Sequence, residues 1–139
     1  MTTLADLLSA TGAEVYDHLV TDIEVPVRTG PVSQGDVRFR PLATATGIRL
    51  RPHAPWSPVP REGLVLVAGA HSHTLHAGTG DATWTTAVVD PERLAVGVVD
   101  ATAVVHVLHP EHGALALAPG RWLVRRQREQ AEVARLVAD

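Results

Sequence analysis

The sequence contains no cysteine and no lysine, and only 4% of its residues are aromatic. The absence of cysteine excludes disulfide bonds, thiolate zinc sites, iron–sulfur ligation and cysteine nucleophiles. All 12 basic residues are therefore arginine, and together with 15 acidic residues they give a formal net charge of −3. This mild acidity argues against nucleic acid or a membrane surface as the partner, because both need a basic protein surface.

Length and hydrophobic patterning set the domain organisation. A chain of 139 residues corresponds to a single domain, 1–139, that is long enough to bury a core. Apolar residues make up 45% of the chain, so Val, Leu and Ala must fill that core. No stretch approaches the roughly 20 apolar residues of a membrane span. The first residues carry neither a basic region nor an apolar run, which predicts no signal peptide. We therefore expect a soluble, cytoplasmic protein.

Helices are expected only at the two ends of the chain. In residues 1–20, leucines at helical spacing predict two short helices, 3–10 and 12–20. The pair Thr11 and Glu14 has the spacing of a capping box at the start of the second helix. A further amphipathic helix is expected over 128–138.

Residues 22–127 have the pattern of a β core. Short apolar segments separated by Gly, Pro and Asp predict a single-domain β-sandwich or small barrel. The apolar run 64–68 is typical of a strand covered on both faces, and the prolines of 52–60 predict an extended loop. The expected strands are 23–28, 37–40, 48–51, 64–68, 72–76, 83–89, 94–100, 102–109, 114–118 and 121–127.

Histidines gather in two groups within this core. Residues two apart on a strand share a face, so His71 and His73 should point one way and His76 the other. In the second group, His109 should share a face with Val105 and Val107, and His112 follows at a turn. Neutral imidazoles suit zinc, iron(II), manganese or nickel. The sequence thus suggests a divalent metal site formed by His71, His73, His109 and His112.

The same residues allow a second interpretation. Glu111 would be a ligand, an orienting residue or the acid/base of an enzyme if a metal binds. Otherwise the histidines are surface residues or satisfied core residues, and His-x-His is a weak signal alone. His76 and His106 are the least expected ligands, and His106 is expected to be a core histidine. The first cupin motif needs a glutamate that residues 75–80 lack. The protein is therefore cupin-like at most by architecture.

Several motifs resemble an uncharacterised family of small, β-rich bacterial proteins. They are Gln34-Gly35-Asp36-Val37, His71-Ser72-His73, His109-Pro110-Glu111-His112-Gly113, Leu117-Ala118-Pro119-Gly120 and Val124-Arg125-Arg126-Gln127-Arg128-Glu129. Together they cover about residues 34–129. The resemblance implies one shared site or interface, formed by His71, His73, His109, Glu111, His112, Gln127 and Arg128. It implies no particular reaction.

Two functions from different classes remain open. The first is a non-catalytic β module that self-assembles or docks on a protein partner, since small β domains often close their sheet edges by association. The second is a small histidine-ligated metalloprotein, with an enzymatic role left undecided. A basic segment of Arg126, Gln127 and Arg128 could hold an anion or belong to an interface.

Overall fold

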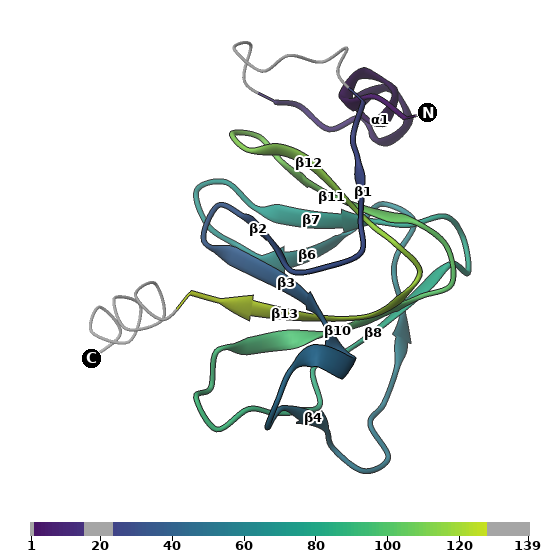
Figure 1. The fold of residues 1–139 in the computed structure, drawn as a ribbon. Helices are drawn as coiled ribbons and strands as arrows, with labels where there is room; N and C mark the ends of the chain where they lie inside the picture. The colour runs from purple at the N-terminus through teal and green to yellow at the C-terminus, as the bar shows by residue number, and fades with distance from the viewer. Residues whose placement is uncertain (1, 16–23, 128–139) are drawn as a thin grey trace.

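The computed structural model describes residues 2–15 and 24–127 and shows a mainly β protein (Figure 1). Two sheets of five and six strands make up most of it, and a two-stranded ribbon lies beside them. No helix in the described part of the chain is long and apolar enough to cross a membrane.

The first sheet has the strand order β1-β12-β11-β7-β6. Its edge strand β1 pairs in parallel with β12, whereas all other neighbours are antiparallel. The strands are β1 (Val27–Arg28), β12 (Gly113–Leu117), β11 (Val105–His109), β7 (His73–His76) and β6 (Leu64–Val67).

The second sheet has the order β2-β3-β13-β10-β8-β5 and is antiparallel throughout. Its long central strands β10 and β13 pair over most of their length. The strands are β2 (Val32–Gln34), β3 (Val37–Pro41), β13 (Gly120–Arg126), β10 (Ala95–Ala101), β8 (Ala82–Thr85) and β5 (Ser57–Pro58). The ribbon consists of β4 (Arg49–Leu50) and β9 (Val88–Val89).

The two sheets bury a common core between their inner faces. Alternate residues point inward, so that Phe39 and Val124 of the six-stranded sheet meet Leu75 and Leu117 of the five-stranded sheet. Neither strand order closes on itself in the described residues. The sandwich expected from the sequence therefore describes the architecture, and the barrel does not.

Outer layers cover part of each sheet. Helix α1 (Leu4–Thr11) packs Leu4 and Leu7 against Leu108 on the outer face of the five-stranded sheet. The short 3₁₀ helix η1 (Leu42–Thr44) and the ribbon cover the outer face of the other sheet, where Val98 and Leu123 are buried. Strand β10 is therefore covered on both faces. Its consecutive residues Val98 and Val99 point to opposite layers, and both are 0% exposed.

The ends of α1 differ from the sequence expectation. The helix begins with a capping box between Thr3 and Asp6, and it ends at Gly12, whose φ of 71° suits a glycine. The capping box predicted for Thr11 and Glu14 is wrong. Thr11 is the last residue of α1, and its hydroxyl donates to the carbonyl of Leu7 at 2.6 Å. Residues 12–15 are not helical; residues 16–20 and the helix predicted at 128–138 lie outside the described residues.

Strand β6 also differs from expectation. The apolar run 64–68 predicted a strand covered on both faces, yet β6 lies at a sheet edge and Val65 is 52% exposed. This correction has a simple physical origin. A short apolar run does not by itself distinguish a central strand from an edge strand that lacks a neighbour.

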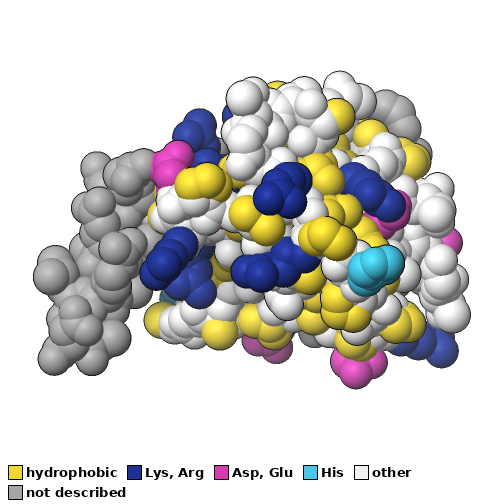
Figure 2. All heavy atoms as spheres, turned by 90° about the horizontal axis from the view of Figure 1, so that it is seen from below, with side chains coloured by type: hydrophobic (Ala, Val, Ile, Leu, Met, Phe, Trp, Pro, Cys, Tyr) yellow, Lys and Arg dark blue, Asp and Glu magenta, His cyan; other side chains and the backbone are white. Residues whose placement is uncertain are grey.

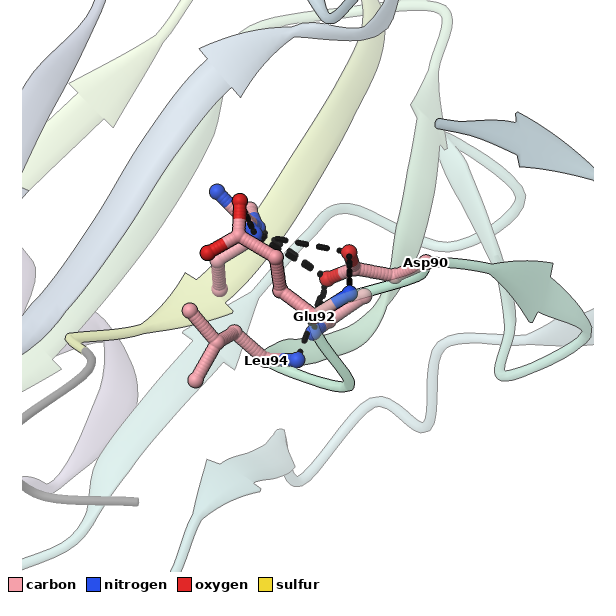
Figure 3. A network of polar contacts seen from close by, with 5 residues as sticks. Asp90, Glu92 and Leu94 are labelled. Atoms are coloured by element: carbon pink, nitrogen blue, oxygen red, sulfur yellow. Dashed lines mark hydrogen bonds and ion pairs between the residues drawn. The ribbon is translucent and has the colours of Figure 1, made fainter. Parts of the chain in front are cut away.

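A buried carboxylate closes the turn between β9 and β10. The Asp90 side chain, 3% exposed, accepts backbone N–H bonds from Glu92, Leu94 and Ala95 at 2.9–3.1 Å (Figure 3). It also receives the guanidinium of Arg125 from β13 at 3.2 Å. A turn thus joins β9 to β10, and Arg125 is held by an ion pair.

Candidate functional site

Four histidines meet at one end of the five-stranded sheet. His73 begins β7 and His109 ends β11, and the antiparallel register brings these two ends together. Both side chains point inward and are 3% and 5% exposed. The exposed His71 and His112 flank them on the adjoining loops. Ring centroids lie 4.4 Å apart for His73 and His109, 4.6 Å for His109 and His112, and 6.0 Å for His71 and His109.

Gln34 joins this cluster from the other sheet. It is 5% exposed, and its amide nitrogen donates to the carbonyls of Val107 at 2.9 Å and Gly113 at 3.4 Å. Because carbonyls only accept hydrogen bonds, this contact fixes the orientation of the amide. Its oxygen therefore faces His73, whose Nδ1 lies 2.8 Å away and donates to it.

The second ring nitrogen of His73 meets a carboxylate. His73 Nε2 lies 3.3 Å from Oδ1 of Asp36, whose side chain is 42% exposed. Burial lowers the pKa of His73 below its ordinary value, and the neighbouring carboxylate opposes this shift. His73 therefore connects the buried end of the cluster to an accessible acidic residue.

His109 has a different role in the cluster. Its Nδ1 accepts backbone N–H bonds from Glu111 at 3.1 Å and His112 at 3.2 Å, so it caps the turn between β11 and β12. Burial, followed by the neighbouring His73, lowers the pKa of His109. The neutral ring then carries its hydrogen on Nε2. The side chain of Glu111 is exposed at this turn.

The structure brings together His71, His73, His109 and His112, as the metal-site hypothesis requires. As the side chains lie, however, no three His, Asp or Glu residues in the described part of the chain are placed to hold a metal ion. Gln34 and Asp36 are the residues that the site prediction missed. They belong to the motif at 34–37, which carried the resemblance but was not assigned to the site.

Of the C-terminal residues predicted for the site, the structure describes Arg126 and Gln127. Gln127 lies beside the cluster, because its backbone N–H donates to the carbonyl of Asp36 at 3.0 Å and its side chain to that of Gly35 at 3.4 Å. Arg126 is exposed at the end of β13. Arg128 lies outside the described residues.

His76 and His106 lie apart from the cluster, on the outer face of the same sheet. They are paired across β7 and β11 and line a cavity of about 480 Å³ with Leu7 and Arg61. Burial lowers the pKa of both side chains. The prediction of a core histidine at position 106 is therefore wrong: its ring is half-buried, on a face that α1 covers only in part.

A basic groove lies on the outer face of the six-stranded sheet. Arg38, Arg40 and Arg125 surround a cavity of about 350 Å³ beside Phe39 and Leu123. Figure 2 shows this side of the molecule, where arginines alternate with hydrophobic side chains. The alternation of Arg38 and Arg40 along β3 is the sequence signal for this groove.

Fold and site together define a two-sheet β domain with an imidazole cluster between the ends of its sheets. A family model described as a domain of unknown function, DUF8820, matches residues 33–127, and the chain belongs to this family. The matched segment nearly coincides with the residues that carried the resemblance to an uncharacterised family. No curated protein and no solved structure matches the chain.

Proposed function

We propose that this protein is a non-catalytic β module of the cytoplasm that assembles with a second copy of itself through the edge strand β6. The observation that carries the proposal is the open apolar edge of the five-stranded sheet. Among the described residues, no strand pairs with the outer side of β6, and Val65 is 52% exposed on it. Unpaired backbone groups on such a strand are a template for another strand.

The other sheet edges carry features that oppose pairing. Strands β1 and β5 have two residues each, with Pro26 preceding β1 and Pro58 within β5. Strand β2 has three residues and follows Pro31. Proline and short length are common devices that protect edges. Strand β6 has a register irregularity between Val65 and Val67, but it is longer, with four residues, and the segment 63–70 contains neither proline nor a charged residue. The least protected edge is therefore β6.

Symmetry restricts how two copies can pair. A two-fold axis perpendicular to the sheet keeps outer residues on the outer face, so Val65 must oppose an outer residue of the second copy. Pairing Val65 with its own symmetry mate satisfies this condition and makes β6 antiparallel to itself. The product is a continuous sheet formed from two five-stranded sheets.

The first test places a charge at the centre of this contact. In Val65→Lys, two like charges would face each other across the axis, which destabilises strand pairing. We expect wild type to be a dimer by sedimentation velocity and the apparent dissociation constant of the variant to rise at least about tenfold. The matched control is Val27→Lys on β1, because Val27 is 50% exposed at the opposite edge. A wild type that stays monomeric at all concentrations would refute the proposal.

A second test reads the register directly. Because the chain has no cysteine, Val65→Cys introduces a single thiol. Directly opposed Cβ atoms in an antiparallel pair lie about 4.5–5.5 Å apart, close enough for mild oxidation to form a disulfide. We expect covalent dimers from Val65→Cys and few from Val27→Cys. Equal cross-linking of both variants would contradict pairing through β6.

A further inference from the structure

The contact between His73 Nε2 and the Asp36 carboxylate calls for a positive charge. Since the Gln34 amide presents its oxygen to His73 Nδ1 at 2.8 Å, the hydrogen of the neutral ring is on Nδ1. The lone pair on Nε2 then faces Oδ1 of Asp36 at 3.3 Å. Two acceptors in contact repel each other, so this pair is stable only when a positive charge, a second proton or a metal ion, lies beside both atoms.

The geometry of the pair matches two ligands of one metal ion. Zinc bonds to imidazole nitrogen are about 2.0–2.1 Å long and those to carboxylate oxygen about 2.0–2.2 Å, and a tetrahedral angle then separates the two ligand atoms by about 3.4 Å. The observed separation of 3.3 Å agrees with this value. The hydrogen bond to Gln34 is also what a ligating histidine needs, because a partner on the other ring nitrogen fixes its orientation.

His112 lies next to this pair and would become a third ligand if its ring turned. The Nε2 atom of His112 lies against Gly35, only 2.7 Å from where a β-carbon would be, and Gly35 immediately precedes Asp36. His112 is exposed, so its ring can turn toward Asp36 without disturbing the core. His109 does not qualify, because its Nδ1 lone pair already accepts two backbone N–H groups.

We propose that His73 Nε2, an Asp36 carboxylate oxygen and His112 Nε2 bind one divalent transition-metal ion of the zinc class, with the fourth position open to water. This ligand set differs from the one predicted from the sequence. Asp36 takes the place of His109, and His71 is not a ligand. Two imidazoles and a carboxylate are a donor set that zinc, iron(II), manganese and nickel accept. Asp36 is 42% exposed, which gives the ion a path from solvent.

The test is a metal titration of untagged, chelator-treated protein. We expect wild type to bind about one Zn²⁺ per chain by calorimetry, and Co²⁺ to give visible absorption of a four-coordinate site. Asp36→Asn and His112→Ala each remove a ligand at a partly or fully exposed position, so both variants should fold. Each should weaken Zn²⁺ binding at least about tenfold.

The matched control is His76→Ala on the same strand. His76 points to the opposite face of β7, and its removal should leave the Zn²⁺ affinity unchanged. If wild type takes up no Zn²⁺ or Co²⁺ at micromolar concentration, the positive charge beside His73 is a proton and the proposal is wrong. Binding by Asp36→Asn with wild-type affinity would refute the ligand set.

Discussion

Gln34 is the residue that ties the two sheets together beside the histidine cluster. It extends from β2 of one sheet and bonds the backbone of β11 and β12 in the other, across 73 and 79 positions of sequence. Its amide oxygen accepts from His73, so all its bonds are made inside the protein. No buried side-chain nitrogen or oxygen in the described part of the chain lacks a partner. The Gln34 amide is thus fully satisfied inside the protein, and its bonds rigidify this end of the sandwich.

Removal of this amide should therefore be costly. In Gln34→Ala, the carbonyl of Val107 and the Nδ1–H of His73 lose their partner in a buried site, and each buried unsatisfied group costs about 1–3 kcal/mol. We expect the free energy of unfolding to fall by about 2–4 kcal/mol, measured by urea denaturation at fixed protein concentration.

Gln127→Ala provides the control for this variant. The side chain of Gln127 makes a long, exposed bond to Gly35 at 3.4 Å, and the loss of this bond should cost no more than about 0.5 kcal/mol. Equal destabilisation by the two variants would show that Gln34 does not have the structural role inferred for it.

At the residue scale, the sequence predicted the four histidines of the cluster but not the residues that bond to them. The parity of strand positions placed His73 and His76 on opposite faces, and the structure agrees, with His73 in the core and His76 on the outer face. It could not identify Gln34 and Asp36 as the partners of His73. Those contacts depend on which sheet β2 joins and on how the sheets face each other, and local periodicity contains neither fact.

At the scale of elements, the turn before β10 depends on one buried ion pair. Asp90, 3% exposed, accepts three backbone N–H groups and the guanidinium of Arg125, which is 23% exposed. A second Asp–Arg pair joins β10 to β13 at Asp100 and Arg121, but it is exposed, at 34% and 49%. The two pairs have the same chemistry and different burial, so they form a natural comparison.

We expect Asp90→Ala to be far more harmful than Asp100→Ala. The first substitution leaves three N–H groups without an acceptor and Arg125 without its buried partner, at a cost of about 2–4 kcal/mol. The second removes a solvent-exposed ion pair, which contributes about 0–1 kcal/mol. Thermal or urea unfolding of both variants gives the two values. Similar losses would mean that the turn does not depend on the Asp90 side chain.

Most strands were predictable because their apolar residues alternate, as in β3, where Val37 and Phe39 are buried and Arg38 and Arg40 are exposed. The position of a strand within its sheet, central or edge, could not be predicted in this way. The runs at β6 and β10 are both apolar, yet β6 is an edge strand and β10 lies between two layers. Which run is central depends on tertiary pairing.

At the scale of the whole molecule, the two sheets are covered unequally on their outer faces. The segment from η1 to the ribbon buries Val98 and Leu123 on one side. On the other side, α1 covers Leu108 but leaves the cavity of His76 and His106 partly open. His76 and His106 are therefore half-buried on this face, beside a cavity that α1 covers only in part.

This arrangement should make the protein sensitive to acid. Burial lowers the pKa of His76 below 6.5, and burial together with His76 lowers that of His106. Among the described residues, the other charged side chain that lines the cavity is Arg61, and its positive charge opposes protonation of the rings. The unfolded chain therefore binds these protons first as the pH falls. The contribution of these histidines to the free energy of unfolding is fully present above 6.5, the ordinary pKa of histidine in the unfolded chain. It is lost as the pH falls from there toward the lower pKa values of the folded state.

We expect the free energy of unfolding, measured with urea in the presence of a chelator, to be lower at pH 5.5 than at pH 7.5. His73 and His109 shift in the same direction. On acidification, the double variant His76→Gln/His106→Gln should therefore lose less stability than wild type. A part of the loss should remain, because His73 and His109 are still present. His53→Gln, in an exposed loop, should lose as much as wild type. An unchanged pH dependence in the double variant would mean that the outer-face histidines titrate normally in the folded protein.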